Sequence, residues 1–443
     1  MKIAAIALAL STMLTVEQRD ARRSMSDHPT SAVSADGRFI AFTTFSQLAP
    51  ADVDSSSDVY VLDRVRQHVT LESTSPPARG RFGEAGPGHA LAIDSQRPGI
   101  SGDGRFVVYE RNDVIVVRDR RDGVTKVVAI GTQPFITEDG HTVLFTATDF
   151  DRVKAVDVNG LRNDVYSVDV RSGDGRRVSD DLHGLDNALA SSVSPTASAD
   201  GRYVAFTSRP PFQSSDTRAS RVYVRDTALN VTKFVGAGWK PSISGDGQFV
   251  AFVGVSDRMP HIFLADLQTG ATRVITKSVR RGLANGVSGN PTMSSDGRFV
   301  AFQSEANDLV AADDFNLLPD VFVFDRTTGA ITRISGDPGG VWMEPSGGPS
   351  IDATGSVVAF SSRHPTDASD KRNDFDLYVA TLRSLNTVSM SSTQGRGSAG
   401  IFSTNSLRLS VSAARYSYSS RFPVTLLNGP GRASSLSRIR DVQ

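Results

Sequence analysis

Acidic side chains recur in this chain at a spacing suited to a hard cation. The pattern D-x-[D/N]-x3-D occurs at Asp52, Asp54 and Asp58, and again at Asp314, Asn316 and Asp320. Carboxylate and amide oxygens at alternate loop positions are ligands that Ca²⁺ prefers. Neither segment has the central Gly or the terminal Glu of an EF-hand, and Asp and Asn also form local turns without a metal. The spacing predicts a Ca²⁺ site in each segment, with turn formation as the alternative, and no other cofactor is indicated.

The sequence contains none of the common catalytic motifs that are recognised by the spacing of their residues. The seven histidines form no H-E-x-x-H pair, no G-x-S-x-G nucleophile elbow occurs, and there is no cysteine. These absences remove the commonest sequence signatures of zinc hydrolases, serine hydrolases and thiol enzymes. A binding module is therefore favoured over an enzyme, and no catalytic residue is assigned.

A nine-residue phrase recurs along the chain and indicates the elements that position these side chains. It has the form Ser-x-Asp-Gly followed by an apolar run, as in Ser34 to Phe42, with further or related copies at 101–109, 137–145, 198–206, 244–252, 294–302 and 352–360. An eighth, eroded copy runs from Ser412 to Tyr418. Gly suits the left-handed position of a tight hairpin. Consecutive apolar residues after it indicate a strand that is covered on both faces.

Each copy predicts one four-stranded antiparallel blade, with strands A to D in chain order. A single meander cannot bury both of its faces, whereas blades stacked around a ring bury one another. We therefore predict an all-β fold: a single β-propeller over residues 28–443. Eight blades are favoured, with a degenerate last blade at about 400–443, and seven blades are the alternative.

The repeated Asp-Gly turn resembles the WD-like repeat of TolB-type propellers. The resemblance covers roughly residues 28 to 440 and implies the propeller fold. No copy has Pro inside the turn motif, and the first repeat begins too early for the α/β domain that precedes the propeller in TolB. The resemblance therefore implies nothing about a role in the Tol envelope machinery.

Loop lengths predict which face of the ring binds. In such a meander the A–B and C–D connections share one face, and the B–C and D–A connections share the other. The A–B and C–D turns are short, whereas the long segments are B–C and D–A loops. Long loops on a rigid scaffold commonly carry function. We therefore expect binding on the B–C and D–A face.

Two sets of residues are candidates for contact with a ligand on that face. Six A strands are expected to begin with Pro, and the residues before these prolines are expected to ring the channel mouth: Arg97, Gln133, Ser194, Lys240, Asn290 and Gly348. Trp239 and Trp342 lie in D–A loops and could form an aromatic platform for a sugar or an apolar side chain. The alternatives are solvated loop ends for the first set and packing between blades for the tryptophans.

The charge balance and the N-terminal segment limit the binding partners and the cellular compartment that the sequence predicts. Lys plus Arg equals Asp plus Glu, 48 of each, so no global field favours nucleic acid. Residues 1–27 read as a signal peptide and leader, because Lys2 precedes an apolar run that is too short to span a bilayer. The sequence thus predicts an exported, periplasmic or extracellular monomer without an integral membrane segment. It would bind a protein or glycan, the alternative being a carbohydrate-active enzyme, lyase- or hydrolase-like, with its site at the channel mouth.

Overall fold

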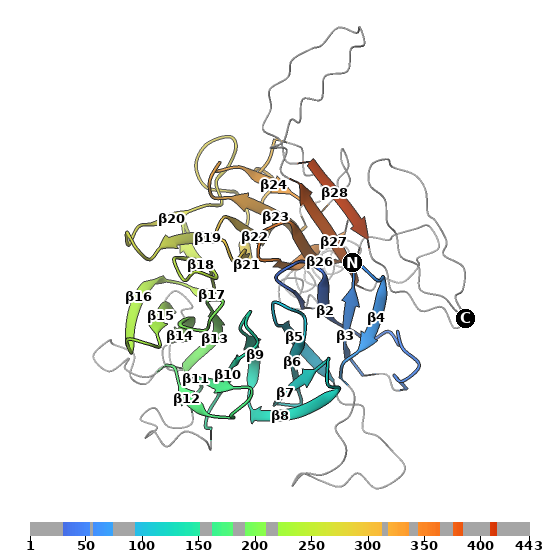
Figure 1. Cartoon of the computed structure of the whole chain (residues 1–443). Coiled ribbons are helices and arrows are strands. Elements are labelled where there is room, and N and C mark those ends of the chain that lie inside the picture. The colour runs from blue at the N-terminus through green and yellow to red at the C-terminus, as the bar shows by residue number, and fades with distance from the viewer. Residues whose placement is uncertain are drawn as a thin grey trace, which may run out of the picture.

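The computed structural model describes residues 30–53, 56–73, 94–150, 162–179, 191–209, 220–311, 318–335, 344–363, 375–383 and 408–413. Within these residues the chain forms seven four-stranded antiparallel sheets and no helix. The sheets are arranged as blades around a central axis, with strand A of each blade innermost and strand D outermost (Figure 1). The all-β propeller predicted from the repeat is confirmed.

The strands follow the predicted order in every blade. Blade 1 contains β1 (Ser31–Val33), β2 (Phe39–Thr44), β3 (Asp58–Asp63) and β4 (His68–Leu71). Blade 2 contains β5 (Ser95–Ile100), β6 (Phe106–Arg111), β7 (Val114–Asp119) and β8 (Val124–Ile130). Blade 3 contains β9 (Thr132–Ile136), β10 (Thr142–Ala147), β11 (Asp164–Asp169) and β12 (Gly175–Arg177). Blade 4 contains β13 (Ser191–Ala197), β14 (Tyr203–Arg209), β15 (Arg221–Asp226) and β16 (Val231–Ala237).

The last three blades are built in the same way. Blade 5 contains β17 (Trp239–Ile243), β18 (Phe249–Ser256), β19 (Met259–Asp266) and β20 (Thr272–Val274). Blade 6 contains β21 (Ser288–Met293), β22 (Phe299–Ser304), β23 (Asp320–Asp325) and β24 (Ile331–Arg333). Blade 7 contains β25 (Ser346–Ile351), β26 (Val357–Ser362), β27 (Asp376–Arg383) and β28 (Arg408–Ala413).

The preference for eight blades was wrong, and the alternative of seven is correct. Ser412 and Ala413, the first residues of the eroded eighth copy, lie in β28, which pairs with β27 as the outer strand of blade 7. Blade 7 then packs directly on blade 1: Val357, Ala359 and Val379 share a hydrophobic cluster with residues of β2 and β3. A ring already closed by this contact has no gap for another blade. The remainder of the eroded copy, from residue 414, lies outside the described residues.

A small hydrogen-bond network explains the recurring Ser-x-Asp-Gly. In blade 1, Ser34 Oγ donates to Asp36 Oδ1 (2.6 Å), and Asp36 Oδ1 also accepts the Arg38 amide (2.9 Å). Ser34 Oγ in turn accepts the Phe39 amide (2.9 Å). Gly37 has a φ of 69°, the left-handed conformation that favours glycine. The motif is therefore a self-contained turn that starts strand B.

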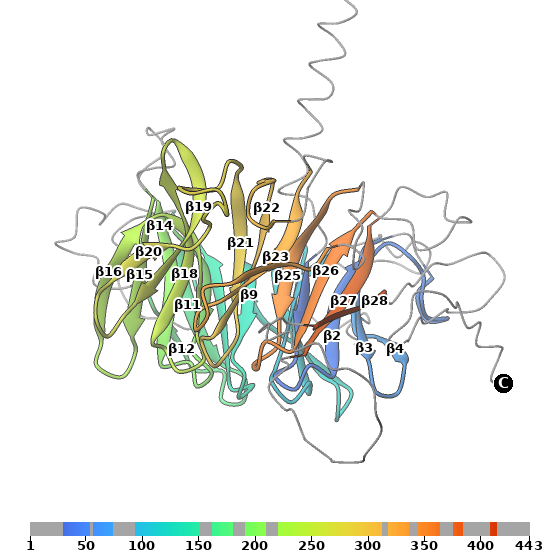
Figure 2. The ribbon, with the colours of Figure 1, turned by 90° about the horizontal axis from the view of Figure 1, so that it is seen from above.

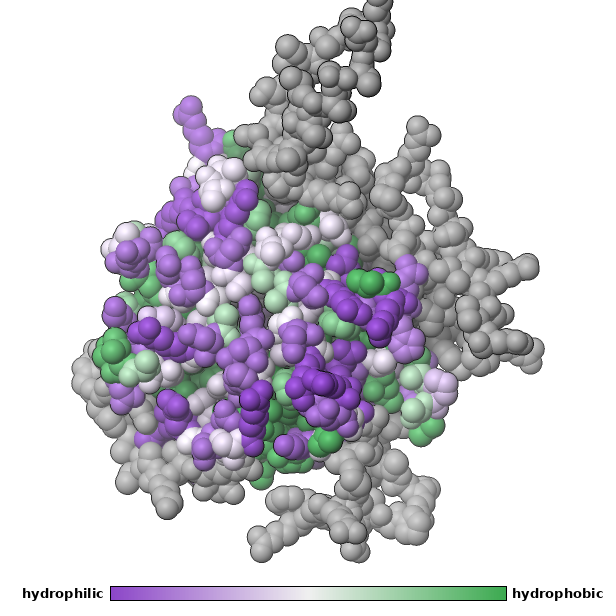
Figure 3. All heavy atoms as spheres, in the orientation of Figure 1, coloured by the Kyte–Doolittle hydropathy of each residue, from purple (hydrophilic) through white to green (hydrophobic). Residues whose placement is uncertain are grey.

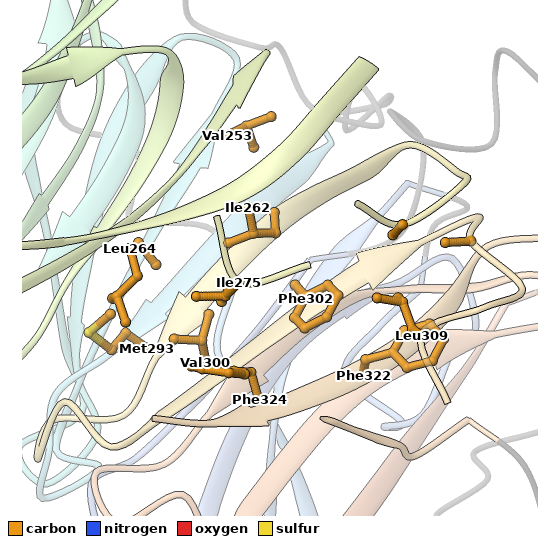
Figure 4. Packing of buried hydrophobic residues seen from close by; sticks show 13 residues of the cluster. Val253, Ile262, Leu264, Ile275, Met293, Val300, Phe302, Leu309, Phe322 and Phe324 are labelled. Carbon is orange, nitrogen blue, oxygen red and sulfur yellow. The ribbon is translucent and has the colours of Figure 1, made fainter. Parts of the chain in front are cut away.

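Aromatic rings on each blade fill the space toward the preceding blade. In six blades a Phe of strand B stacks on a Tyr or Phe of strand C, as Phe302 does on Phe322 at 5.7 Å between ring centroids. Phe302 and Phe322 extend from blade 6 toward Ile262 and Ile275 of blade 5 (Figure 4). Because every interface repeats this packing, the hydrophobic core is a series of layers between blades.

Backbone hydrogen bonds tie the seven A–B turns into a closed circle. The residue in the second position of each turn takes part, and one bond crosses each blade interface at 2.8–3.2 Å. The donor and acceptor residues are Ala35→Gly102, Gly102→Glu138, Asp139→Ala199, Ala199→Gly245, Gly245→Ser295, Asp296→Ala353 and Ala353→Ala35. This circle joins all seven blades at the face that carries the A–B turns. Figure 2 shows the strands running from that face to the opposite one.

Candidate functional site

The two faces of the ring differ as the loop lengths predict. On one face the A–B and C–D turns are tied together, since the Arg64 amide donates to the Arg38 carbonyl (2.9 Å) and Arg38 pairs with Asp63 (2.7 Å). On the other face the B–C and D–A connections meet. There the Ser95 amide donates to the Ser57 carbonyl (2.6 Å). The hydropathy surface in Figure 3 is mostly hydrophilic, with hydrophobic residues in scattered groups.

The residues before the six prolines have an unusual backbone conformation. All six have positive φ, between 50° and 60°: Arg97, Gln133, Ser194, Lys240, Asn290 and Gly348. At each of them the register between strands A and B shifts, which marks a β-bulge on the innermost strand. A non-glycine residue in this conformation costs about 1–2 kcal/mol. Gly348 shows that glycine satisfies the same backbone, yet five blades keep a polar side chain there.

Hydrogen bonds between neighbouring blades fix this ring of residues. Glu110 Oε2 accepts from Arg97 Nη1 (2.8 Å) and from the Gln133 amide (3.0 Å) of the next blade. Gln133 Oε1 then accepts the Ser194 amide (2.8 Å). Lys240 Nζ donates to Asn290 Oδ1 (2.7 Å) across the interface of blades 5 and 6. The ring is thus a rigid polar rim, which we call the channel mouth.

Two cations of the mouth act on each other across the ring. Burial lowers the pKa of Lys240, and the positive charges of Arg209 and Arg97 lower it further. Arg97 belongs to blade 2 and Lys240 to blade 5, so residues from separate blades contribute positive charge to the mouth. Lys240 is solvent-accessible, and the Arg97 side chain is 44% exposed. Glu110 forms an ion pair with Arg97 at this rim (2.8 Å).

At the opposite end of the channel the side chains are small, with one exception. The second residues of the seven turns are Ala35, Gly102, Glu138, Ala199, Gly245, Ser295 and Ala353. The Glu138 side chain of blade 3 hydrogen-bonds Ser295 of blade 6, and burial raises the pKa of the Glu138 carboxyl. Glu138 was not among the predicted site residues, although it is the one large side chain among the second residues of these seven turns.

Of the two tryptophans, Trp239 lies within the described residues. Trp239, the first residue of β17, is half-buried and packs on the hydrophobic cluster between blades 5 and 6. Packing between blades, the alternative considered for the tryptophans, therefore describes Trp239. Trp342 lies outside the described residues.

The acidic residues that start strand C have structural partners. Asp58 accepts from Ser73 Oγ in blade 1, and Asp320 accepts from Ser335 Oγ in blade 6 (2.5 Å). Each Ser Oγ also accepts the amide of the residue after the Asp. Asp52 accepts from the Tyr60 hydroxyl. Asp54, Asp314 and Asn316 lie outside the described residues.

In blade 5 a histidine takes the place of this aspartate. His261 Nδ1 lies 3.2 Å from Thr276 Oγ1, the same fifteen-residue separation as between Asp58 and Ser73. The His261 side chain is fully buried, and burial lowers its pKa. His261 therefore contacts the second residue after strand D of its blade, as Asp58 does in blade 1. This position does not indicate catalysis. Within the described part of the chain no three His, Cys, Asp or Glu side chains form a metal-binding group.

Comparison with known proteins shows the fold. No family model and no curated protein matches the chain. Among solved structures, an oligogalacturonate lyase in complex with manganese matches with a TM-score of 0.51 and 15% identity, over 80% of this chain and 89% of that one. The β-propeller domain of the trilobed protease from Pyrococcus furiosus, described as having an open velcro topology, matches with a TM-score of 0.50 and 12% identity, over 80% and 93%. TolB from Acinetobacter baumannii matches with a TM-score of 0.41 and 17% identity, over 68% and 64%.

These identities establish a shared architecture and no more. The chain is a seven-bladed β-propeller, and the propeller fold expected from the repeat is confirmed. No helix that could cross a bilayer occurs in the ranges that the structure describes.

Proposed function

We propose that the chain is an exported binding module that takes a polar, negatively charged ligand into its channel mouth. The observation that carries this proposal is the ring of positive-φ residues. Five of its six members keep a polar side chain where Gly348 shows that glycine suffices. Backbone strain that the fold does not require points to a role for the side chains.

The charge of the rim supports an anionic ligand, whether on a glycan or on a protein partner. Arg97 and Arg209 both act electrostatically on Lys240, and Glu110 pairs with Arg97. Cations held at fixed positions in a concave, partly desolvated site attract anions and bind them through charge-assisted hydrogen bonds. The circle of turns at the far end favours entry from the mouth.

Lys240→Met is expected to weaken binding of an anionic probe at least about tenfold, because it removes one charge-assisted contact of 1.5–3 kcal/mol. Trigalacturonate is a suitable probe, with maltotriose as the neutral comparison, and calorimetric titration measures both. Lys126→Met, which removes an exposed lysine from the outer strand β8, is the control and should bind normally. Equal affinity of the two variants, or equal affinity for both sugars, would exclude the mouth as an anion site.

A carbohydrate-active enzyme is the second candidate, and Lys240 is the observation that favours it. Burial and the charges of Arg209 and Arg97 lower the pKa of Lys240, which is the direction that a general base requires. A lyase would convert trigalacturonate into an unsaturated product, which absorbs in the ultraviolet. Formation of that product by the unmodified chain and its loss in Lys240→Met would establish the enzyme; binding without turnover would establish the binding module.

We also propose, as a separate property, that the segments around Asp52 and Asp320 bind Ca²⁺. The repeated spacing supports the proposal, while the bonds of Asp58 to Ser73 and of Asp320 to Ser335 support turn formation. Excess Ca²⁺ is expected to raise the melting temperature relative to chelator, since a ligand that binds only the folded state stabilises it. The Asp52→Asn, Asp314→Asn double variant should lose this shift. An unchanged melting temperature of the unmodified chain in calcium and chelator would leave turn formation as the explanation.

A further inference from the structure

Blade 2 departs from the other blades at three positions that lie close together. Its strand B carries Tyr109 where the other blades have Phe, and its strand C carries Val116 where they have Tyr or Phe. Six blades therefore stack two rings with centroids 5.5–6.0 Å apart, and blade 2 has one ring and an isopropyl group. At the end of strand B, blade 2 has Arg111, where blades 4, 6 and 7 have Ser.

The register of blade 2 places these residues on one side of the sheet. Tyr109 and Arg111 are two residues apart in β6, so their side chains point to the same face. Ser95 of β5 pairs with Arg111, and Val116 of β7 pairs with Tyr109. That face is directed at blade 1, because Tyr109 and Val116 pack with Val59 and Val61.

Buried hydrogen-bond donors on this face have no acceptor within the described part of the chain. The Tyr109 hydroxyl, the Ser95 hydroxyl, and Nε and Nη1 of Arg111 are each shielded from solvent and without a partner. Burial raises the pKa of the Tyr109 phenol to about 12, so it stays protonated and able to donate. An arginine guanidinium can only donate and never loses its proton. Leaving such donors unpaired is costly, so the site calls for a group rich in acceptors.

The guanidinium groups around the site outnumber the carboxylates by three to two. Glu72 is shared by Arg120 (2.8 Å) and Arg118 (3.6 Å). Asp58, which like Glu72 acts electrostatically on Tyr109, is bonded to Ser73. In the described part of the chain no carboxylate lies within 4.0 Å of Arg111. A neutral water would accept hydrogen bonds from these donors but would not balance the positive charge of Arg111. An anion would do both.

We propose that the face of blade 2 directed at blade 1 binds a small oxyanion, held by Arg111, Tyr109 and Ser95. Phosphate, sulfate and a free carboxylate share the required chemistry, since each offers several acceptor oxygens to a guanidinium and two hydroxyl groups. Arg111 supplies the charge, and Tyr109 and Ser95 supply single hydrogen bonds. The site is distinct from the channel mouth and does not depend on the function proposed for it.

The test is thermal unfolding of the full chain at constant ionic strength, with chloride replaced stepwise by phosphate, sulfate or acetate. At least one oxyanion is expected to raise the melting temperature by about 2 °C or more at millimolar concentration, since binding only to the folded state stabilises it. Arg111→Ser should abolish this shift. The variant recreates the Ser–Ser pair that blades 6 and 7 already contain, each with an Oγ–Oγ distance of 2.9 Å, so the fold has a precedent for it.

Tyr109→Phe is the second variant, because Phe occupies this position in the other six blades. It should retain the fold and weaken the anion-dependent shift without abolishing it. Sulfate also stabilises proteins by exclusion from their surfaces, and that effect should be equal in all three chains. Equal shifts in the unmodified and Arg111→Ser chains, or no shift with any of the three oxyanions, would overturn the proposal and leave buried water as the acceptor.

Discussion

A chain that ends at Asn405 is expected to lose most of its stability, because it lacks β28, the outer strand of blade 7. β28 pairs with β27 over six residue pairs, from Tyr378↔Ala413 to Arg383↔Arg408. Removing roughly six backbone hydrogen bonds at 0.5–1.5 kcal/mol each costs about 3–9 kcal/mol. That is comparable to the whole stability of an ordinary domain. Since blade 7 also closes the ring against blade 1, aggregation through the exposed edge should accompany the loss.

A chain that ends at Arg415 is the matched control. It keeps β28 and every other described strand, so it should unfold at a temperature close to that of the full chain. Circular dichroism melts of the two truncated chains give the comparison. If the chain ending at Asn405 melted with the full chain, β28 would be dispensable. If the chain ending at Arg415 collapsed as well, residues beyond 415 would contribute to closure.

Gly104→Ala is expected to destabilise the protein by about 2–5 kcal/mol. Gly104 has a φ of 72°, where a Cβ costs about 1–2 kcal/mol. A Cβ there would also lie 2.2 Å from the Phe39 ring of the neighbouring blade, and overpacking of this kind typically costs 1–3 kcal/mol. The substitution thus combines backbone strain with a collision at the interface of blades 1 and 2.

Gly123→Ala separates the two causes. Gly123 has a similar φ of 67°, but an added Cβ would meet nothing within 4 Å. This variant should therefore lose only the 1–2 kcal/mol of backbone strain. Urea unfolding of both variants measures the difference. Equal losses would show that the Phe39 ring moves aside freely and that the interface tolerates the methyl group.

Much of the architecture follows from the sequence because the repeat is local. The Ser-x-Asp-Gly turn is stabilised by its own side chains, as Ser34, Asp36 and Phe39 show, so it forms wherever the motif occurs. Strand order within a blade and the division of loops between the two faces follow from the same repeat. The residues at the channel mouth were predictable for the same reason, since a Pro in strand A marks each of them.

The number of blades and the chemistry between them depended on the tertiary structure. Ser412 and Ala413 matched the start of a new blade in sequence, yet ring closure between Val357 of blade 7 and blade 1 makes their strand the last of blade 7. Closure is a property of seven interfaces together, and no single repeat encodes it. In the same way, Glu138 and Ser295 approach each other only because the ring brings blades 3 and 6 to one axis. Arg111 is an ordinary arginine in the sequence, and only the packed ring leaves its Nε and Nη1 shielded from solvent without an acceptor among the described residues.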